Sequence, residues 1–308
     1  MSVFDKLSIN TATIKKASLA EALTLTAGAG LSHIGLWRDK VAEVGLETAV
    51  DMVRASGLQV SSLCRGGFLT AADGAGQAAA LADNQAAILE AKALGAPEII
   101  MVVGGLPDFS VSPGAVDRTA GDDDGGSATA VAGGKDLVLA RRRVADRLAE
   151  LVPFALEHGV RLVLEPLHPM YAADRAVVST LGQALDLAAP HPAAAVGVVV
   201  DTFHVWWDPY LREQITRAGD EGRIASYQVC DFKVPIAADA LLSRGFMGDG
   251  VIDFASIGQW VAEAGYDGVV EVEIFNQEIW DQPFAEVIDT VKARYAELVA
   301  PHLATVSV

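Results

Sequence analysis

Four residues with oxygen donors each interrupt or end a strongly apolar run of the sequence: Glu165, Asp201, Gln228 and Glu273. The run Val198–Val200, for example, leads directly into Asp201. An ionised carboxylate that follows a buried run must be paired with a cation, solvated or bound to a metal. Any one of these residues alone could face solvent at a strand end or cap the next helix. Four of them, at corresponding positions of their runs, indicate a shared site.

The chemistry of such a site follows from its donors. Carboxylate and amide oxygens suit manganese, magnesium or cobalt better than the thiolates of structural zinc sites do. We therefore expect Mn²⁺, with Mg²⁺ or Co²⁺ as alternatives. The ion could bind a carbonyl and a hydroxyl oxygen of a sugar and stabilise the enediolate that forms when a neighbouring C–H proton is lost. Glu165 and Glu273 are the natural catalytic pair to remove and return that proton, besides being ligands.

Further polar and aromatic residues follow the same runs. His168 could be an acid or base beside the metal, or a hydrogen-bonded residue that positions its Pro-flanked loop. Arg65 and Lys233 could bind a phosphate or carboxylate of the substrate, or pair with nearby acids. Three aromatic side chains could stack on a sugar face or pack at the edge of the site: Trp206, Trp207 and Phe68.

Eight short runs rich in Val, Ile and Leu alternate with longer Ala-rich stretches. Continuous apolar runs are typical of parallel strands that are buried on both faces. The predicted strands are Leu7–Ile14, His33–Arg38, Gln59–Gly66, Glu98–Gly104, Arg161–Leu167, Val196–His204, Ile224–Phe232 and Gly268–Phe275.

A predicted helix follows each strand, and Gly or Pro ends several of them. Ser179 and Asp253 are candidate N-caps. The predicted helices are Ser18–Gly28, Gly45–Ala55, Gln77–Leu94, Lys135–His158, Thr180–Ala189, Pro209–Ala218, Phe254–Ala264 and Pro283–Ala300.

Eight strand–helix alternations favour a single α/β domain over residues 1–308, a closed (β/α)8 TIM barrel. A doubly wound open sheet is the alternative, but no Gly-rich phosphate turn follows the first strand. Active sites of such barrels lie at the C-terminal ends of the strands. The four oxygen donors follow predicted strands five to eight, so we expect them to converge there.

One segment breaks the alternation, an inserted loop at about residues 106–134. A loop of this length is unusual in a compact domain. It is either a mobile, solvated insertion or a flap over the mouth of the barrel. The aspartates at 122–124 lack the alternating ligands and the distal Glu of a calcium-binding loop.

The composition excludes several classes of protein. The 308 residues carry a formal net charge of −17, which repels nucleic acid and anionic membrane surfaces. No apolar run is long enough for a membrane span, and we see no signal peptide at the N-terminus. Two distant cysteines, Cys64 and Cys230, form no disulfide framework. We therefore expect a cytoplasmic protein, and a homo-oligomer.

Five motifs, in this order, resemble the sugar phosphate isomerase/epimerase superfamily of xylose isomerase-like TIM barrels, which includes AP endonuclease family 2. The resemblance covers nearly the whole chain. The motifs are Leu164–Pro166, Val200–His204, Tyr227–Asp231, Arg244–Asp253 and Gly265–Glu273.

The resemblance implies a role for each residue that matches a family motif. Glu165, Asp201 and Glu273 fall on the family's metal carboxylates. Many members have His at the position of Gln228. Members that resemble hydroxypyruvate isomerase have Gln there, as this chain does.

The family's substrate-binding positions are also matched. His204 falls on the substrate-contacting His, and Arg244 on a loop Arg that contacts substrate oxygens or a phosphate. Glu271 shares a face with Glu273 and is expected to lie deeper in the barrel.

The resemblance implies isomerisation or epimerisation of a sugar or sugar derivative, in carbohydrate metabolism. The alternative is a lyase that uses the same first step for β-elimination from a 3-keto-glycoside, like C-glycoside deglycosidase catalytic subunits, which pair with a small second subunit. A DNA-repair endonuclease would need more histidines than the six present and a basic face. Intact Glu165 and Glu273 argue against a non-catalytic sugar-binding barrel.

Overall fold

Eight parallel strands form a closed barrel in the computed structural model, which describes residues 2–107 and 134–303. The strand order around the barrel is β1-β10-β7-β6-β5-β4-β3-β2. The predicted (β/α)8 fold is thus confirmed, whereas the predicted loop at 106–134 falls almost wholly outside the described residues. The barrel strands are β1 Leu7–Asn10, β2 His33–Trp37, β3 Gln59–Gly67, β4 Glu98–Val102, β5 Arg161–Leu164, β6 Val196–Asp201, β7 Ile224–Val229 and β10 Val270–Val272.

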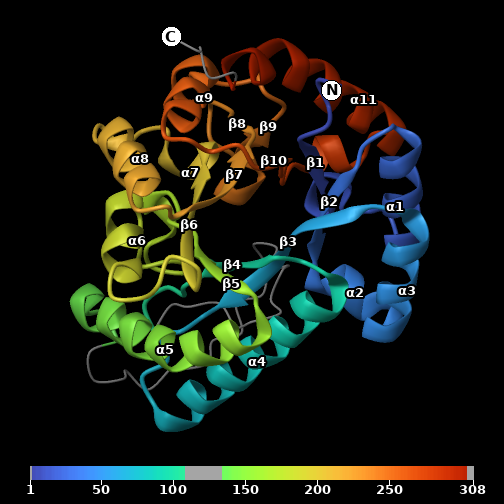
Figure 1. Cartoon of the computed structure of the whole chain (residues 1–308). Helices are drawn as coiled ribbons and strands as arrows, with labels where there is room; N and C mark the ends of the chain where they lie inside the picture. Colours follow the sequence, from blue (N-terminus) through green and yellow to red (C-terminus); the bar gives the residue numbers. More distant parts are fainter. Residues whose placement is uncertain (1, 108–133, 304–308) are drawn as a thin grey trace.

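Helices surround the strands as an outer ring (Figure 1). None of the described helices combines the length and the hydrophobicity that a membrane span requires. The helices are α1 Leu19–Gly28, α2 Arg38–Val44, α3 Leu46–Ser56, α4 Gly74–Leu94, α5 Leu137–His158, α6 Leu181–Ala188, α7 Thr202–Val205, α8 Leu211–Asp220, α9 Phe254–Glu263, α10 Gln277–Trp280 and α11 Phe284–Leu298. Four short 3₁₀ helices are η1 Thr11–Ile14, η2 Pro169–Tyr171, η3 Ala240–Ser243 and η4 Ala300–His302.

Several predicted strands are too long at their C-terminal ends. The side chain of Asn10 accepts a hydrogen bond from the backbone N–H of Ala12, and Asp201 accepts one from Phe203. Each of these caps turns the chain into a helix directly after its strand. Beyond β7 the chain leaves the barrel and forms β8 (Asp231–Phe232), which pairs antiparallel with β9 (Arg244–Gly245).

The helix caps agree with the sequence in part. Asp253 caps α9, as predicted, and accepts a hydrogen bond from the Ser256 backbone. The prediction of Ser179 as the N-cap of α6 is wrong, because Thr180 accepts the hydrogen bond from the Gln183 N–H.

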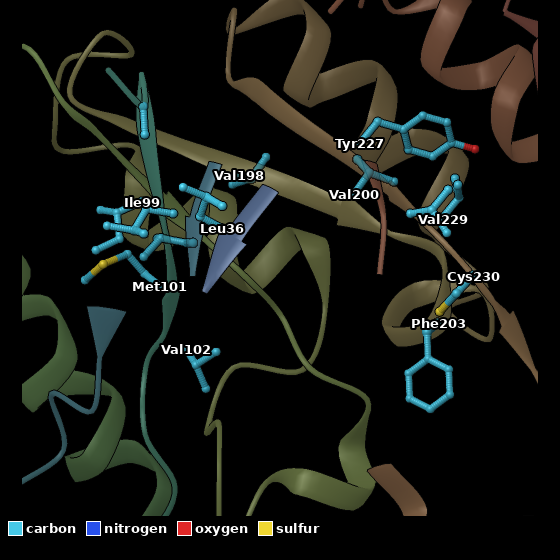
Figure 2. Close-up of a cluster of buried hydrophobic side chains, with 14 of the residues drawn as sticks. Leu36, Ile99, Met101, Val102, Val198, Val200, Phe203, Tyr227, Val229 and Cys230 are labelled. Atoms are coloured by element: carbon cyan, nitrogen blue, oxygen red, sulfur yellow. The ribbon is translucent and has the colours of Figure 1, made fainter. Parts of the chain in front are cut away.

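Strand residues alternate between two apolar layers, and this alternation fixes which side chains enter the barrel. One layer lies between strands and helices and includes Val198, Val200, Tyr227 and Val229, seen in Figure 2. The residues between them in sequence point into the barrel, where a smaller cluster forms. That inner cluster contains Cys64, Ile100, Val163 and Val199.

The alternation of inward and outward side chains continues into the polar residues at the strand ends. Glu165 stands two residues after Val163, and Asp201 two after Val199. Gln228 alternates with the outward Tyr227 and Val229. The same rule directs Glu273 inward, since Val270 and Val272 belong to the outer layer. All four oxygen donors are therefore brought to the interior of the barrel by strand periodicity alone.

Gly67 lies where β3 approaches β4 most closely, and its conformation requires glycine. Its φ is +112°, and a Cβ built on it would lie 1.8 Å from the carbonyl oxygen of Val102. We expect Gly67→Ala to lower the free energy of unfolding by about 3 kcal/mol or more. Gly28→Ala, with no atom within 4 Å of its Cβ, is the matched control. Equal urea midpoints for the two variants would contradict this expectation.

Candidate metal centre and active site

Three buried carboxylates and one buried amide meet at the C-terminal mouth of the barrel. Glu165 directly follows β5, Asp201 ends β6, Gln228 lies in β7 and Glu273 follows β10. None of these four residues is more than 5% exposed. Three carboxylates in so little solvent require compensation by cations or protons.

Two kinds of contact place these groups around one space. Side-chain donor atoms of Glu165, Asp201 and His204 all lie within 4.8 Å of one another. Arg244 Nη1 lies 3.1 Å from an Asp201 carboxylate oxygen and 3.2 Å from one of Glu273. The Arg244 guanidinium therefore bridges two of the acids, and the third faces the same space. The acids predicted from separate strands do converge.

The donors pass a test for a divalent cation. Oε1 of Glu165 and Oε1 of Gln228 are buried and accept no hydrogen bond from the described part of the chain. A buried oxygen without a donor is costly, and such orphans are rare in folded proteins. A cation would satisfy both atoms and offset the mutual repulsion of the carboxylates. The residues present thus fit a metal with hard oxygen ligands.

Glu271 lies on the same face as Glu273, one pleat deeper in the barrel, and holds the amide of Gln228 in place. Gln228 Nε2 donates to Glu271 Oε1 at 3.3 Å, which leaves the amide oxygen as the free acceptor. Asn10 donates to the same carboxylate at 2.7 Å, and Ser61 and Ser62 also donate to it.

A missing side chain opposite makes room for the Glu271 carboxylate. A Cβ on Gly35 would lie 2.5 Å from the Glu271 carboxyl carbon. Residue 35 points inward from β2, so only glycine leaves space for the carboxylate at this depth. Glu271 thus lies beneath the mouth, as its position in the sequence predicted.

Burial dominates the protonation of the acids. It raises the pKa of Glu165 well above its ordinary value, and the charges of Asp201 and Glu273 raise it further. Burial raises the pKa of Glu273 to about 7, although the positive charge of Arg244 opposes this shift. Burial also raises the pKa of Asp201, against the same opposing charge. Without a further cation, the acids share protons at neutral pH.

His204 is neutral in this environment. Burial lowers its pKa well below the ordinary value, and the charge of Arg244 lowers it further. Its Nδ1 faces the backbone N–H of His168 at 3.1 Å, and its Nε2 faces Arg244 Nη2 at 2.9 Å. A neutral ring carries a proton on one nitrogen and can accept at the other only. One of these contacts is therefore unsatisfied, and Arg244 is the partner that can turn away.

Arg244 remains charged at this depth. Burial opposes its charge, but Asp201 and Glu273 outweigh burial and raise its pKa well above the ordinary value. The guanidinium carbon lies 4.7 Å from the centre of the Phe203 ring. Asn276 donates to the Arg244 backbone carbonyl at 2.7 Å and fixes the loop that delivers the side chain.

A pocket of about 50 Å³ opens at the mouth beside these residues, and its wall includes Glu165, Glu273, His204 and Arg244. Such a volume holds about one or two waters, so a sugar can enter only when a long side chain such as Arg244 makes more room. A larger cavity of about 860 Å³ lies at the opposite end of the barrel. We assign the site to the mouth, because the strand-end acids and orphaned oxygens lie there.

The other site residues predicted from the sequence do not all line the mouth pocket. Arg65 lines the mouth pocket, but His168, Trp206 and Lys233 are not part of its described wall. The ring of His168 packs 5.5 Å from that of Phe232, and Nδ1 accepts from the Met170 backbone.

Trp206 and Lys233 have contacts of their own away from the pocket. Trp206 packs on Phe232 with ring centres 5.2 Å apart. Lys233 pairs with Glu278 at 3.5 Å on the surface. Their suggested roles with substrate therefore stay predictions without support from the pocket.

Among the polar residues of the pocket wall, the sequence analysis missed Trp37, Tyr171 and Arg175. Trp37 Nε1 donates to Glu273 Oε1 at 2.9 Å and orients that carboxylate. Trp37 ends β2, so the rule that sites lie at strand ends could have identified it. Tyr171 and Arg175 lie in the loop after β5, where no periodic pattern points to them.

Comparisons with known proteins place the chain among similar barrels. A family model described as xylose isomerase-like TIM barrel matches residues 23–294. Inosose isomerase of Halalkalibacterium halodurans is 29% identical over 166 residues, which cover 53% of this chain and 56% of that protein. The match thus spans about half the length of each of the two proteins.

Solved structures match over almost the whole chain. Protein SMc04130 of Sinorhizobium meliloti 1021 has a TM-score of 0.85 and 44% identity, and the match covers 97% of this chain and 99% of that one. An IOLI protein with a bound zinc atom has a TM-score of 0.77 at 21% identity, over 97% and 100% of the two chains. At that identity the second likeness shows the fold alone.

Proposed function

The chain belongs to the xylose isomerase-like TIM barrel family, and from this premise we propose that it is a divalent-metal-dependent isomerase or epimerase of a sugar or a related polyhydroxylated ketone. The observation that carries the proposal is the buried acid cluster at the barrel mouth, with unsatisfied oxygens on Glu165 and Gln228. The similarity to inosose isomerase supports a ketone of this class as substrate.

Glu165, Asp201, Gln228 and Glu273 would hold the metal, and His204 lies close enough to two of them to contribute. When bound, the ion supplies positive charge that polarises a carbonyl and makes the neighbouring C–H bond more acidic. An all-oxygen ligand set favours Mn²⁺, with Mg²⁺ or Co²⁺ as alternatives. Bound zinc is a property of the similar IOLI structure and becomes the competing assignment if His204 is a ligand.

Glu165 and Glu273 approach the site from β5 and β10, two strands that are not neighbours in the barrel. Each can take a proton from the carbon beside the carbonyl or return one to it. In the metal-free protein, burial raises the pKa of Glu273 to about 7. The Trp37 indole N–H holds Oε1 of Glu273, and Oε2 faces Arg244 Nη1 at 3.2 Å. Neutral His204 is suited to hydrogen-bond a substrate hydroxyl.

A lyase that acts on a 3-keto-glycoside stays the alternative. His168 as an additional base, and Trp206 and Trp207 as a platform for an aglycone, would suit it. None of these three side chains is part of the described wall of the mouth pocket. Isomerisation or epimerisation needs only the two carboxylates that do line it.

Solvent exchange distinguishes these reactions. We expect the Mn²⁺-loaded protein, incubated in D₂O with a panel of ketoses and inosose, to place deuterium on the carbon beside the carbonyl. Proton NMR would follow both exchange and product. A product of unchanged mass apart from deuterium supports the proposal. Release of an aglycone from a 3-keto-glycoside, without exchange into any free ketose, would replace it with the lyase.

The amide orientation gives a prediction about Gln228 as a ligand. Glu271→Met removes the oxygen that accepts from Gln228 Nε2 and allows the amide to turn. We expect the affinity for Mn²⁺ to fall about 10- to 100-fold, as for other groups that orient metal ligands. Competition with a fluorescent chelator measures this without turnover. Exposed Glu286→Met is the control, and equal affinities for the two variants would contradict the proposed role of Gln228.

A further inference from the structure

Arg65 lines the mouth pocket and forms no hydrogen bond or ion pair with another residue of the described ranges 2–107 and 134–303. The charges of Asp83 and Glu165 favour its charged form only from a distance. Its contacts are aromatic instead. The guanidinium carbon lies 4.2 Å from the centre of the Phe68 ring and 5.9 Å from that of Trp37. Stacking of this kind holds the plane of an arginine and leaves its N–H groups for a ligand.

Arg175 lines the same pocket and is also poorly compensated. Its Nε is buried and makes no hydrogen bond to any described residue. The nearest carboxylate belongs to Asp174, the preceding residue, at 3.5 Å. Its guanidinium carbon lies 5.9 Å from the centre of the Tyr171 ring. Both arginines thus line one pocket, and each has N–H groups without a hydrogen-bond partner among the described residues.

The two charges repel one another. Burial lowers the pKa of Arg65 to about 10, and the charge of Arg175 contributes to the shift. Arg65 nevertheless stays charged at neutral pH. Like charges in a partly buried pocket are unfavourable unless an anion joins them.

The arginines of the chain are compensated unevenly. Arg38 contacts Glu90 at 2.7 Å, and Arg223 contacts Glu221 at 2.9 Å. Arg143 and Arg161 each have a buried N–H group without a partner among the described residues, but neither lines the mouth pocket. What distinguishes Arg65 and Arg175 is that both line one pocket, beside the acid cluster.

We propose that Arg65 and Arg175 form a subsite for an oxyanion, so that the substrate carries a carboxylate or a phosphate. The inference rests on the proposed function and narrows its substrate class from polyhydroxylated ketones to acidic or phosphorylated ones. The carbonyl end of the substrate faces Glu165 and Glu273, and its anionic end faces the two guanidinium groups. A planar arginine fork matches either oxyanion with two parallel hydrogen bonds.

Binding of inorganic phosphate tests the subsite without turnover. Calorimetric titration of the chelator-treated protein at constant ionic strength is compared with Arg65→Met and Arg175→Met. We expect saturable binding, weakened about 10- to 100-fold in each variant, the range for a lost charge-assisted hydrogen bond. Arg212→Met is the matched control, since this exposed side chain has only a 4.0 Å contact with Glu263. Absence of saturable binding, or equal binding by all variants, would overturn the subsite.

Acetate in a parallel titration distinguishes the two sources of the anion. Stronger binding of phosphate indicates a phosphorylated substrate, and stronger binding of acetate a carboxylated one. Arg65→Lys guards against a folding defect, because it keeps the charge and loses the fork. We expect it to bind phosphate with an affinity between those of the parent and of Arg65→Met.

Turnover separates this inference from the proposed function. We expect the ratio of kcat/KM for fructose 6-phosphate to that for fructose to fall about 10- to 100-fold in Arg65→Met. An unchanged ratio would remove the subsite and keep the isomerase. Phosphate binding that depends on Arg65, in a protein that exchanges no ketose proton, would keep the subsite and remove the isomerase.

Discussion

Replacing Glu273 by Gln is expected to lower kcat of the metal-loaded protein about 1,000-fold or more, with little change in folding. The substitution removes a proposed base and one negative ligand, and both losses act on the transition state. The shape of the side chain is kept, and the amide oxygen can still accept the Trp37 N–H. Arg244 keeps its contact with Asp201 at 3.1 Å. The ratio of kcat values, at a Mn²⁺ concentration that saturates each protein, measures the effect.

Glu278→Gln is the matched control for that variant. Glu278 lies in α10, close to Glu273 in sequence, and its side chain is largely exposed. We expect its turnover to equal that of the parent. Thermal unfolding of Glu273→Gln would show whether the barrel is intact. Near-normal turnover in a folded Glu273→Gln protein would remove Glu273 from the mechanism.

A divalent metal is expected to stabilise the protein far more at pH 8 than at pH 5.5. Ligand carboxylates must lose their protons before they bind, so metal competes with protons for them. Burial raises the pKa of Glu165 well above its ordinary value and that of Glu273 to about 7. At pH 5.5 Glu273 is largely protonated, and at pH 8 it is ionised and available.

The stability of the metal-free protein depends on pH in the opposite direction and falls as pH rises. Between the ordinary value for Glu, 4.5, and the raised value of about 7, folded Glu273 binds more protons than the unfolded chain does. Its contribution to stability is therefore present at low pH and lost as pH rises through that window. For Glu273 alone the loss is at most about 3 kcal/mol.

Paired melting curves with chelator and with Mn²⁺ test this linkage. We expect the Tm of the chelated protein to fall from pH 5.5 to pH 8, and the difference made by Mn²⁺ to grow. The double variant Glu165→Gln/Glu273→Gln should show neither trend. A gain in Tm from Mn²⁺ that is the same at both pH values would mean that other groups bind the metal.

Much of the barrel could be predicted from the sequence, because apolar runs and their parity are local properties. Val199 and Asp201 share a face by strand geometry alone, and the barrel rule then places Asp201 at the mouth. The same argument applies to Glu165 and to Glu273. The proximity of these acids was therefore predictable, although the metal that they would hold was not.

The ends of the strands were less predictable. Apolar residues recur at Phe203 and Val205, beyond Asp201 and Thr202, so the predicted strand was extended to His204. The observed strand stops at Asp201, because its side chain accepts a backbone N–H and begins a helix. The hydrophobic pattern does not show that a residue of the site also caps a helix and thereby ends the strand.

The wall of the pocket was the least predictable part. Arg175 and Tyr171 enter it from the loop after β5, and Arg244 enters from β9, outside the barrel. Their positions depend on how loops pack, which no local pattern encodes. His168 is a residue for which the sequence left two roles open, an acid or base and a residue that positions its loop. It is three residues from Glu165 in sequence, yet its side chain packs beside Phe232 and belongs to no described part of the pocket wall.

Metal content and its link to turnover test the central claim most directly. The purified protein is analysed by mass spectrometry for bound metals, assayed for ketose isomerisation, stripped with a chelator and reloaded with Mn²⁺. The account predicts about one divalent ion per chain, loss of turnover on stripping and recovery on reloading. A metal-free preparation that turns over ketoses at full rate in the presence of chelator would contradict it.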